Sequence, residues 1–100
     1  MKNLLLNFNK AFESKVRLGV MSVLMVNEFV DFRTLKDLLN LSDGNMASHI
    51  KALEELNYIS VNKQFIGKKP NTTYMATKDG KKAFHDHLNA LEALIKEQQK

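Results

Sequence analysis

The feature that most constrains this 100-residue chain is a change in its hydrophobic period near residue 58. Before it, Met46, Ile50 and Leu53 recur at spacings of three and four, which is typical of a helix with one buried face. After it, apolar and polar side chains alternate from Ile59 to Phe65, which is typical of a half-buried strand. The pattern therefore predicts a helix that leads directly into β structure.

Turn residues and a β-branched run extend this prediction to a hairpin. Residues 67–71 contain Gly67, Lys68, Lys69, Pro70 and Asn71, which form a turn-rich tip. Residues 72–77 are rich in threonine and include an aromatic side chain, so they are expected to form the returning strand.

Helical patterns occupy most of the remaining chain. Residues 3–12, 14–27 and 33–40 are expected to form helices, and residues 28–32 a short extended stretch. Ser14 is the predicted N-cap of the second helix. In the third helix, the leucines are expected to face inward, namely Leu35, Leu38 and Leu39.

Two tight boundaries complete the expected order of elements. A turn over residues 41–44 separates the third helix from a helix over about 44–57. Ser42 or Asp43 is the expected N-cap of this helix. Its last inward-facing residue is expected to be Leu56 or Asn57. Thr77 is expected to cap the last helix. Its apolar stripe is Phe84, Leu88, Leu91, Leu94 and Ile95.

Two helices joined by a tight turn and followed by a hairpin define a winged helix-turn-helix. The predicted fold class is α+β and mainly helical, with a two-stranded β-hairpin wing and a long C-terminal helix. One hundred residues with an apolar content of 44% are the size of one domain. We therefore expect a single winged-helix domain over residues 1–100, with a core over about 14–82.

The positive charge is concentrated in the hairpin region. Residues 1–59 carry equal numbers of basic and acidic residues, whereas residues 60–82 carry six lysines and one aspartate, a net charge of +5. A local basic patch is suited to a polyanion, because neutralising phosphates releases condensed counterions. The alternative is a solvated lysine-rich hairpin. The six lysines are Lys63, Lys68, Lys69, Lys78, Lys81 and Lys82.

The helix over 44–57 carries small and polar residues on its exposed side, which suits entry into a DNA major groove. Asn45, Ser48 and His49 are predicted to supply selectivity, and Lys51 to contact phosphate. Surface helices usually prefer Glu and Lys, so an uncrowded first turn favours DNA over a merely solvated face. At the hairpin, Lys63, Lys68 and Lys69 are predicted to contact phosphate, and Lys68 and Lys69 could also enter the minor groove.

The two ends of the chain are expected to form a dimer interface. The predicted terminal helices, at about 3–12 and 78–97, are amphipathic and lie outside the three-helix core, so their stripes require a partner. They could instead pack on each other within one chain, or the last helix could bind another protein. The predicted dimerisation residues are Leu4, Leu5, Phe8, Phe84, Leu88, Leu91 and Ile95.

Several other functions find no support in the sequence. The absence of cysteine removes thiolate chemistry and disulfides, and no phosphate-binding loop, nucleophile motif or set of metal ligands is recognisable. His85 and His87 point to different sides of a helix and are not expected to share a metal. We expect no enzyme activity, cofactor or metal. No signal peptide or membrane span is recognisable, so a cytoplasmic location is expected.

Taken together, these segments resemble small prokaryotic winged-helix transcriptional regulators related to the MarR and ArsR groups, over roughly residues 14–95. The resemblance rests on VRL (16–18), DF (31–32), LSDGNMASHIKALE (41–54), LNYI (56–59), FIGKKPNTTY (65–74) and TKDG (77–80). It implies a dimer that joins through its terminal helices. It also implies DNA contacts from Asn45, Ser48, His49 and Lys51 on the helix, and from Lys68 and Lys69 on the wing.

The sequence also departs from these groups. ArsR-type metal sensors often use cysteines, which are absent here. MarR-type proteins are usually longer and hold an effector pocket, for which this chain has little material, so the existence of an effector is left open. Two functions are weighed. One is a homodimeric regulator, a repressor, that binds a pseudo-palindromic operator in double-stranded DNA. The alternative is a winged-helix module for protein–protein contact without specific DNA binding.

Overall fold

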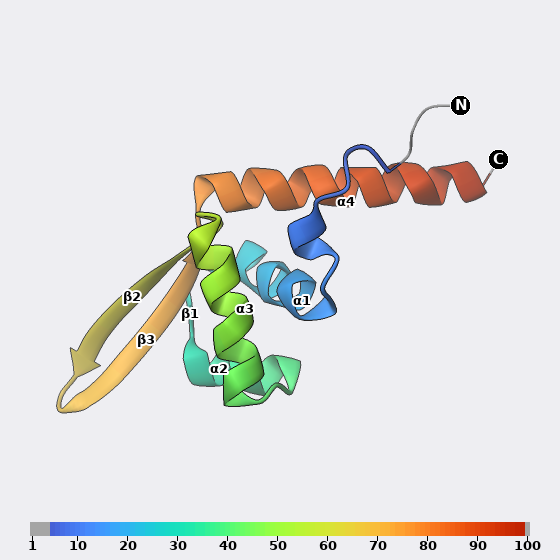
Figure 1. Ribbon diagram of the computed structural model, residues 1–100. Coiled ribbons are helices and arrows are strands. Elements are labelled where there is room, and N and C mark those ends of the chain that lie inside the picture. The colour runs from blue at the N-terminus through green and yellow to red at the C-terminus, as the bar shows by residue number, and fades with distance from the viewer. Residues whose placement is uncertain (1–4, 100) are drawn as a thin grey trace.

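The computed structural model describes residues 5–99 and has the predicted α+β winged-helix architecture. Three helices form a bundle, a hairpin projects from one side of it, and a long C-terminal helix runs across it (Figure 1). In chain order the elements are the 3-10 helix η1 (Lys10–Phe12), α1 (Lys15–Met25), β1 (Val30–Asp31), α2 (Phe32–Leu39), α3 (Asp43–Glu55), β2 (Ile59–Ile66), β3 (Lys69–Ala76) and α4 (Lys78–Gln98).

Hydroxyl side chains cap three of the helices, as the sequence predicts. Ser14 Oγ accepts a hydrogen bond from the backbone N–H of Arg17 at the start of α1 (3.3 Å). In α3, Ser42 Oγ accepts a hydrogen bond from the backbone N–H of Asn45 (3.2 Å). In α4, Thr77 Oγ1 accepts one from the backbone N–H of Gly80 (2.9 Å). Each cap satisfies a backbone donor that has no partner within the helix, which fixes where the helix begins.

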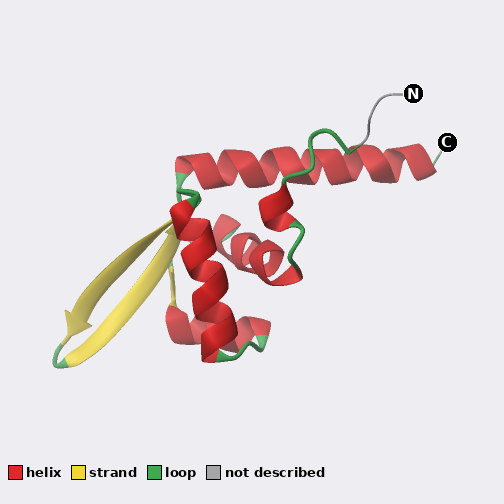
Figure 2. Cartoon of the chain, in the orientation of Figure 1, coloured by secondary structure: helices red, strands yellow, loops and turns green. Residues whose placement is uncertain are grey.

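The hairpin is longer than predicted, because β3 begins at Lys69 rather than at residue 72. The turn contains only Gly67 and Lys68, and Gly67 has a φ of 65°, which glycine adopts without steric cost. The sheet order is β1-β3-β2 and all pairing is antiparallel (Figure 2). Because β1 pairs only with Tyr74 and Thr73, β3 has just one neighbouring strand at Pro70.

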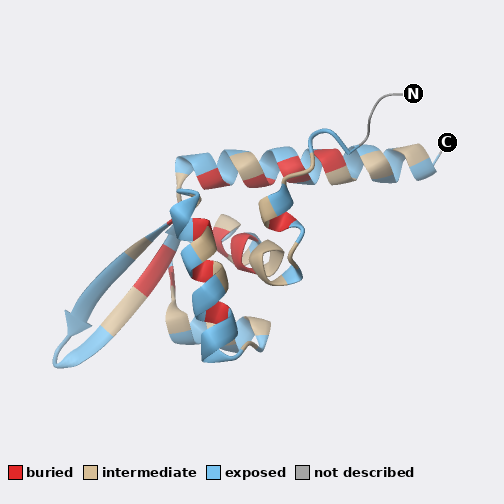
Figure 3. Ribbon diagram, viewed as in Figure 1, coloured by how far each residue is buried: buried red, intermediate tan, exposed pale blue. Residues whose placement is uncertain are grey.

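The core lies where α1, α2, α3, the base of the wing and α4 meet (Figure 3). The predicted stripe of Met46, Ile50 and Leu53 is buried. The prediction that Leu56 or Asn57 is the last inward residue is wrong, since α3 ends at Glu55 and both side chains are exposed. The largest fully buried side chains are Phe84, Met21, Leu24, Leu35, Met46, Leu53, Ile59 and Val20.

The predicted inward direction of Leu38 in α2 is wrong, since its side chain is 63% exposed. At about 100° per residue, the buried side of α2 is centred between Leu35 and Leu39, with Phe32 on the same side. Leu38 lies about 80° around the helix from that centre. The core therefore contacts the side of α2 that holds Phe32, Leu35 and Leu39, and Leu38 lies at the edge of that side.

The predicted helix over residues 3–12 is wrong for the part that the structure describes, while residues 3 and 4 lie outside it. Residues 5–7 form a turn, and only Lys10–Phe12 are helical, as one 3-10 turn. The reason is Asn9, whose backbone is extended and whose side chain accepts from the N–H of Ala11 (2.9 Å). Phe12 is thereby directed into the core.

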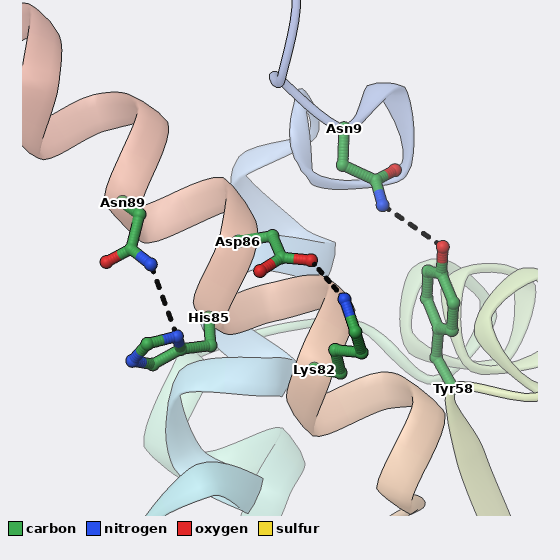
Figure 4. A network of polar contacts seen from close by, with 6 residues as sticks. All are labelled: Asn9, Tyr58, Lys82, His85, Asp86 and Asn89. Atoms are coloured by element: carbon green, nitrogen blue, oxygen red, sulfur yellow. Dashed lines mark hydrogen bonds and ion pairs between the residues drawn. The ribbon is translucent and has the colours of Figure 1, made fainter.

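Asn9 also connects this segment to two distant elements. Its backbone N–H donates to Nδ1 of His87 on α4 (3.0 Å), and its side-chain Nδ2 donates to the hydroxyl of Tyr58 (3.0 Å; Figure 4). The buried His87 ring packs edge-on against Phe8 and is tilted against Phe12. The N-terminal segment therefore packs on α4 within one chain, one of the arrangements open at the sequence level.

The inward side of α4 is rotated from the predicted stripe. Phe84 is buried as expected, and Leu91 and Leu94 are half-buried, but Leu88 and Ile95 are 40% and 57% exposed. Gly80, His87 and Ala90 complete the buried side instead. Away from the core, α4 carries ordinary surface contacts, such as Lys82 with Asp86 and Asn89 with His85 (Figure 4). In residues 5–99, no helix is long and apolar enough to cross a membrane.

Candidate nucleic-acid interface

The outer face of α3 is polar and unobstructed. Asn45, Ser48 and Lys51 are all exposed, on the side away from the buried stripe. At Gly44, an added Cβ would meet no atom within 4 Å, so the space in front of the first turn is open. These three predicted residues therefore share a surface that another molecule can approach closely.

A groove lies between α3 and the wing, with a volume of about 500 Å³. Lys51 on α3 and Lys63 on β2 both line it, so two ammonium groups from different elements border the same hollow. Glu54 is the acidic residue in the lining. Burial, followed by the nearby Glu54 carboxylate, raises the pKa of Tyr74 above its ordinary value of 10.0. The other lining residues are Phe32, Ala47, Ile50 and Val61.

The outer part of the wing is solvated on both faces. Lys68 and Lys69 are exposed at the tip and do not line the groove, and the outer end of the hairpin projects away from α3 (Figure 1). Phe65 and Ile66 lie beside them and are 73% and 63% exposed. Neither apolar residue was among the contacts predicted from the sequence. The alternating pattern of β2 could have indicated Phe65, because it continues beyond the part of the sheet where β1 pairs with β3.

His49 occupies a different position from the other predicted contacts on α3. Its ring is half-buried, and its Nδ1 accepts a hydrogen bond from Nη1 of Arg17 on α1 (3.0 Å). The Nε of Arg17 in turn donates to the carbonyl of Ala11 (2.5 Å). Arg17 therefore links the N-terminal segment to α3. Arg17 lies in one of the segments that carry the family resemblance, but no role was predicted for it from the sequence.

The environment of His49 favours its neutral form. Burial of the ring lowers the pKa of His49 below its ordinary value of 6.5, and the positive charge of Arg17 lowers it further. A neutral imidazole that accepts at Nδ1 carries its proton on Nε2, which is then a hydrogen-bond donor. The Nδ1 atom of His49 thus faces Arg17 on α1, and its Nε2 atom carries the proton that can be donated.

We expect the substitution Arg17→Gln to raise the pKa of His49, because it removes a nearby positive charge that disfavours the imidazolium. The rise should be partial, since burial of the ring remains the larger cause. An NMR titration of the histidine ring protons measures it, and the exposed His85 serves as the internal control. An unchanged His49 pKa would show that the two side chains do not interact in solution.

The predicted dimerisation residues are scattered over three environments. Phe84 is buried in the core, Phe8 is half-buried against His87, and Leu4 lies outside the described residues. Leu88 and Ile95 remain exposed on α4. A second hollow, of about 840 Å³, lies between residues 6–10 and α4, and several of its lining residues are alanines. Leu88 and Ile95 therefore leave apolar surface exposed on α4, whereas Phe84 and Phe8 pack within the chain.

These features define a protein class, a winged helix with an open helix face and a basic wing. The model of the winged helix DNA-binding domain family matches residues 16–95, and the chain belongs to that family. The predicted resemblance to winged-helix regulators is confirmed. The relationship of this chain to the ArsR group stays a prediction.

Individual relatives agree with this assignment. The chain is 34% identical over 87 residues to the uncharacterized protein MJ0432 of Methanocaldococcus jannaschii, covering 87% of this chain and 95% of that protein. A transcriptional regulator homologue from Pyrococcus horikoshii OT3 has the same fold with a TM-score of 0.83 and 29% identity, covering 90% and 89% of the two chains.

More distant structures share the fold alone. AbfR in a DNA-bound structure matches with a TM-score of 0.73 and 15% identity, over 88% of this chain and 67% of its own. A MarR-like regulator from Bacillus cereus ATCC 10987 matches with a TM-score of 0.70 and 23% identity, over 94% of this chain and 70% of its own. Both proteins are longer than this chain, which spans about two thirds of each.

Proposed function

We propose that this protein is a cytoplasmic, homodimeric transcriptional regulator, a repressor, that binds double-stranded DNA sequence-specifically. The observation that carries the proposal is the groove between α3 and the wing, which Lys51 and Lys63 border from two elements. Beside it lies the open face of α3. The DNA-bound structure of AbfR, a protein with the same fold, supports this choice of ligand.

In this proposal α3 enters the major groove, where each base pair presents a distinct pattern of donors and acceptors. Asn45 and Ser48 on the exposed face supply short polar groups for base edges. His49 contributes the Nε2 donor, which its contact with Arg17 through Nδ1 does not use. Lys51 and Lys63, on either side of the protein groove, contact DNA phosphates. Lys68 and Lys69 extend these phosphate contacts along the wing.

The exposed apolar surface of α4 supports the proposed homodimer. Two chains that join through Leu88 and Ile95 bury these side chains in an isologous interface. The two copies of α3 then read half-sites about 10–10.5 base pairs apart, and the operator is pseudo-palindromic because the protein has two-fold symmetry. Occupying such a site represses transcription by excluding the polymerase.

We expect the substitutions Lys51→Ala and Lys63→Ala each to weaken binding to all duplexes by a similar factor, because phosphate contacts carry no sequence information. Each should also reduce the slope of log affinity against log salt by about 0.9 for every phosphate that is no longer neutralised. Fluorescence anisotropy of a labelled duplex over a range of salt concentrations measures both effects.

Lys96→Ala is the matched control, since it removes the same charge from the far end of α4, where Lys96 is 69% exposed and pairs with Glu92. Its salt slope should equal that of the unmodified protein. Equal slopes for all three variants would contradict the assignment of the groove. An absence of DNA binding at low salt would favour the protein-interaction module instead.

A further inference from the structure

The wing tip carries an apolar pair that the phosphate contacts do not use. Phe65 is 73% exposed, and Pro70 lies directly opposite it on the other strand and is also exposed. Single exposed apolar residues are common, but a phenylalanine and a proline paired across a projecting hairpin form a continuous apolar surface. In the described part of the chain, the Phe65 ring packs against no other aromatic ring.

The alternation of the strand places Phe65 on the groove side of the wing. Residues two apart on a strand face the same way, so Val61, Lys63 and Phe65 share one face of β2. Val61 and Lys63 line the groove beside α3. Phe65 therefore continues the groove-lining face beyond the end of the groove, whereas Ile66 points to the opposite face.

The reach and the charge of the wing fit one particular feature of DNA. Phe65 lies four residues beyond Val61, or about 13 Å at ~3.3 Å per residue. This distance is comparable to the ~12 Å width of the major groove, so with α3 in that groove the tip lies at the adjacent minor groove. Lys63 shares the face of Phe65, while Lys68 and Lys69 are exposed at the adjoining tip, and their charges complement the phosphates that flank a minor groove.

We propose that Phe65, backed by Pro70, is an apolar wedge that enters the minor groove and partly unstacks one base step in each half-site. This inference rests on the proposed function and specifies how the wing binds. Apolar side chains that insert between base steps bend DNA toward the major groove, and such bending increases the protein surface that the DNA contacts.

The test uses the duplex that the full-length protein prefers after selection from a randomised library. Versions of that duplex carry the fluorescent base 2-aminopurine at successive positions, and its fluorescence rises when it is unstacked. We expect the unmodified protein to raise the fluorescence at one step in each half-site. Phe65→Ala should abolish that rise and weaken binding about tenfold, equivalent to ~1.4 kcal/mol, with an unchanged salt slope.

Ile66→Ala is the matched control, because it removes a similarly exposed apolar side chain from the opposite face of the same hairpin. It should retain the fluorescence rise and the affinity. The wedge is overturned if the unmodified protein unstacks no step, if the two variants behave alike, or if Phe65→Ala alters self-association but not DNA binding. If no duplex is preferred at all, the proposed function fails, and this inference fails with it.

Discussion

Replacing Gly80 with alanine is expected to destabilise the protein by at least ~3 kcal/mol, at the upper end of what overpacking costs. A Cβ on Gly80 would lie 2.0 Å from the carbonyl oxygen of Tyr58, which is a backbone atom and cannot rotate away. The same carbonyl accepts a hydrogen bond from the N–H of Thr77 (3.0 Å), so any shift also disturbs the start of α4. Thermal unfolding should show a fall in Tm of more than about 12 °C.

Gly44→Ala is the control, because a Cβ at this position meets nothing within 4 Å. In an exposed helical position, alanine should leave the stability unchanged or raise it by up to ~1 kcal/mol. If Gly80→Ala unfolds at the same temperature as the unmodified protein, the close approach of α4 to Tyr58 does not exist in solution.

The double substitution Leu88→Glu with Ile95→Glu is expected to produce a monomer and to lower the affinity for an inverted-repeat duplex by about a hundredfold or more, because the second half-site no longer adds to the first. Both side chains are exposed in the single chain, so the fold should persist. Affinity for a duplex with one half-site should be unchanged. Sedimentation measures the mass, and anisotropy measures both affinities.

Lys96→Glu is the control for charge, since one such reversal changes the net charge by the same two units as the double substitution. Its ion pair with Glu92 is solvent-exposed on both sides and contributes little to stability. The control should remain dimeric and bind normally. A double variant that still sediments as a dimer would place the interface elsewhere on the surface.

Local chemistry explains why much of the fold can be predicted from the sequence. Ser14, Ser42 and Thr77 cap their helices through bonds to residues only three positions away. The stripe of Met46, Ile50 and Leu53 follows from the period of one helix. Such signals lie within a short window, so they do not depend on how the rest of the chain folds.

Contacts between distant residues explain the prediction that failed at the N-terminus. Leu5 and Phe8 have a helical spacing, yet Asn9 makes bonds to Tyr58, 49 positions away, and to His87, 78 positions away. These bonds hold the segment in a turn and bury His87, whose environment no local pattern reveals. The tertiary contacts outweigh the weak propensity of a short terminal helix.

The same distinction applies to the site. Asn45, Ser48 and Lys51 could be placed on an exposed face from helical period alone, and the structure puts them there. The sequence could not show that Lys63 lines the same groove as Lys51, or that Arg17 binds His49 across 32 positions. Those relations depend on the packing of the wing and of α1 against α3.

Selection of bound duplexes from a randomised library, at low and near-physiological salt, shows directly whether the protein is a dimer that binds a specific DNA sequence. We expect an enriched inverted repeat whose half-sites are about 10–10.5 base pairs apart, with binding that weakens as salt rises but keeps its sequence preference. Selection of no common sequence, with weak binding that disappears as salt rises, would contradict the proposed function and leave only non-specific attraction to a polyanion.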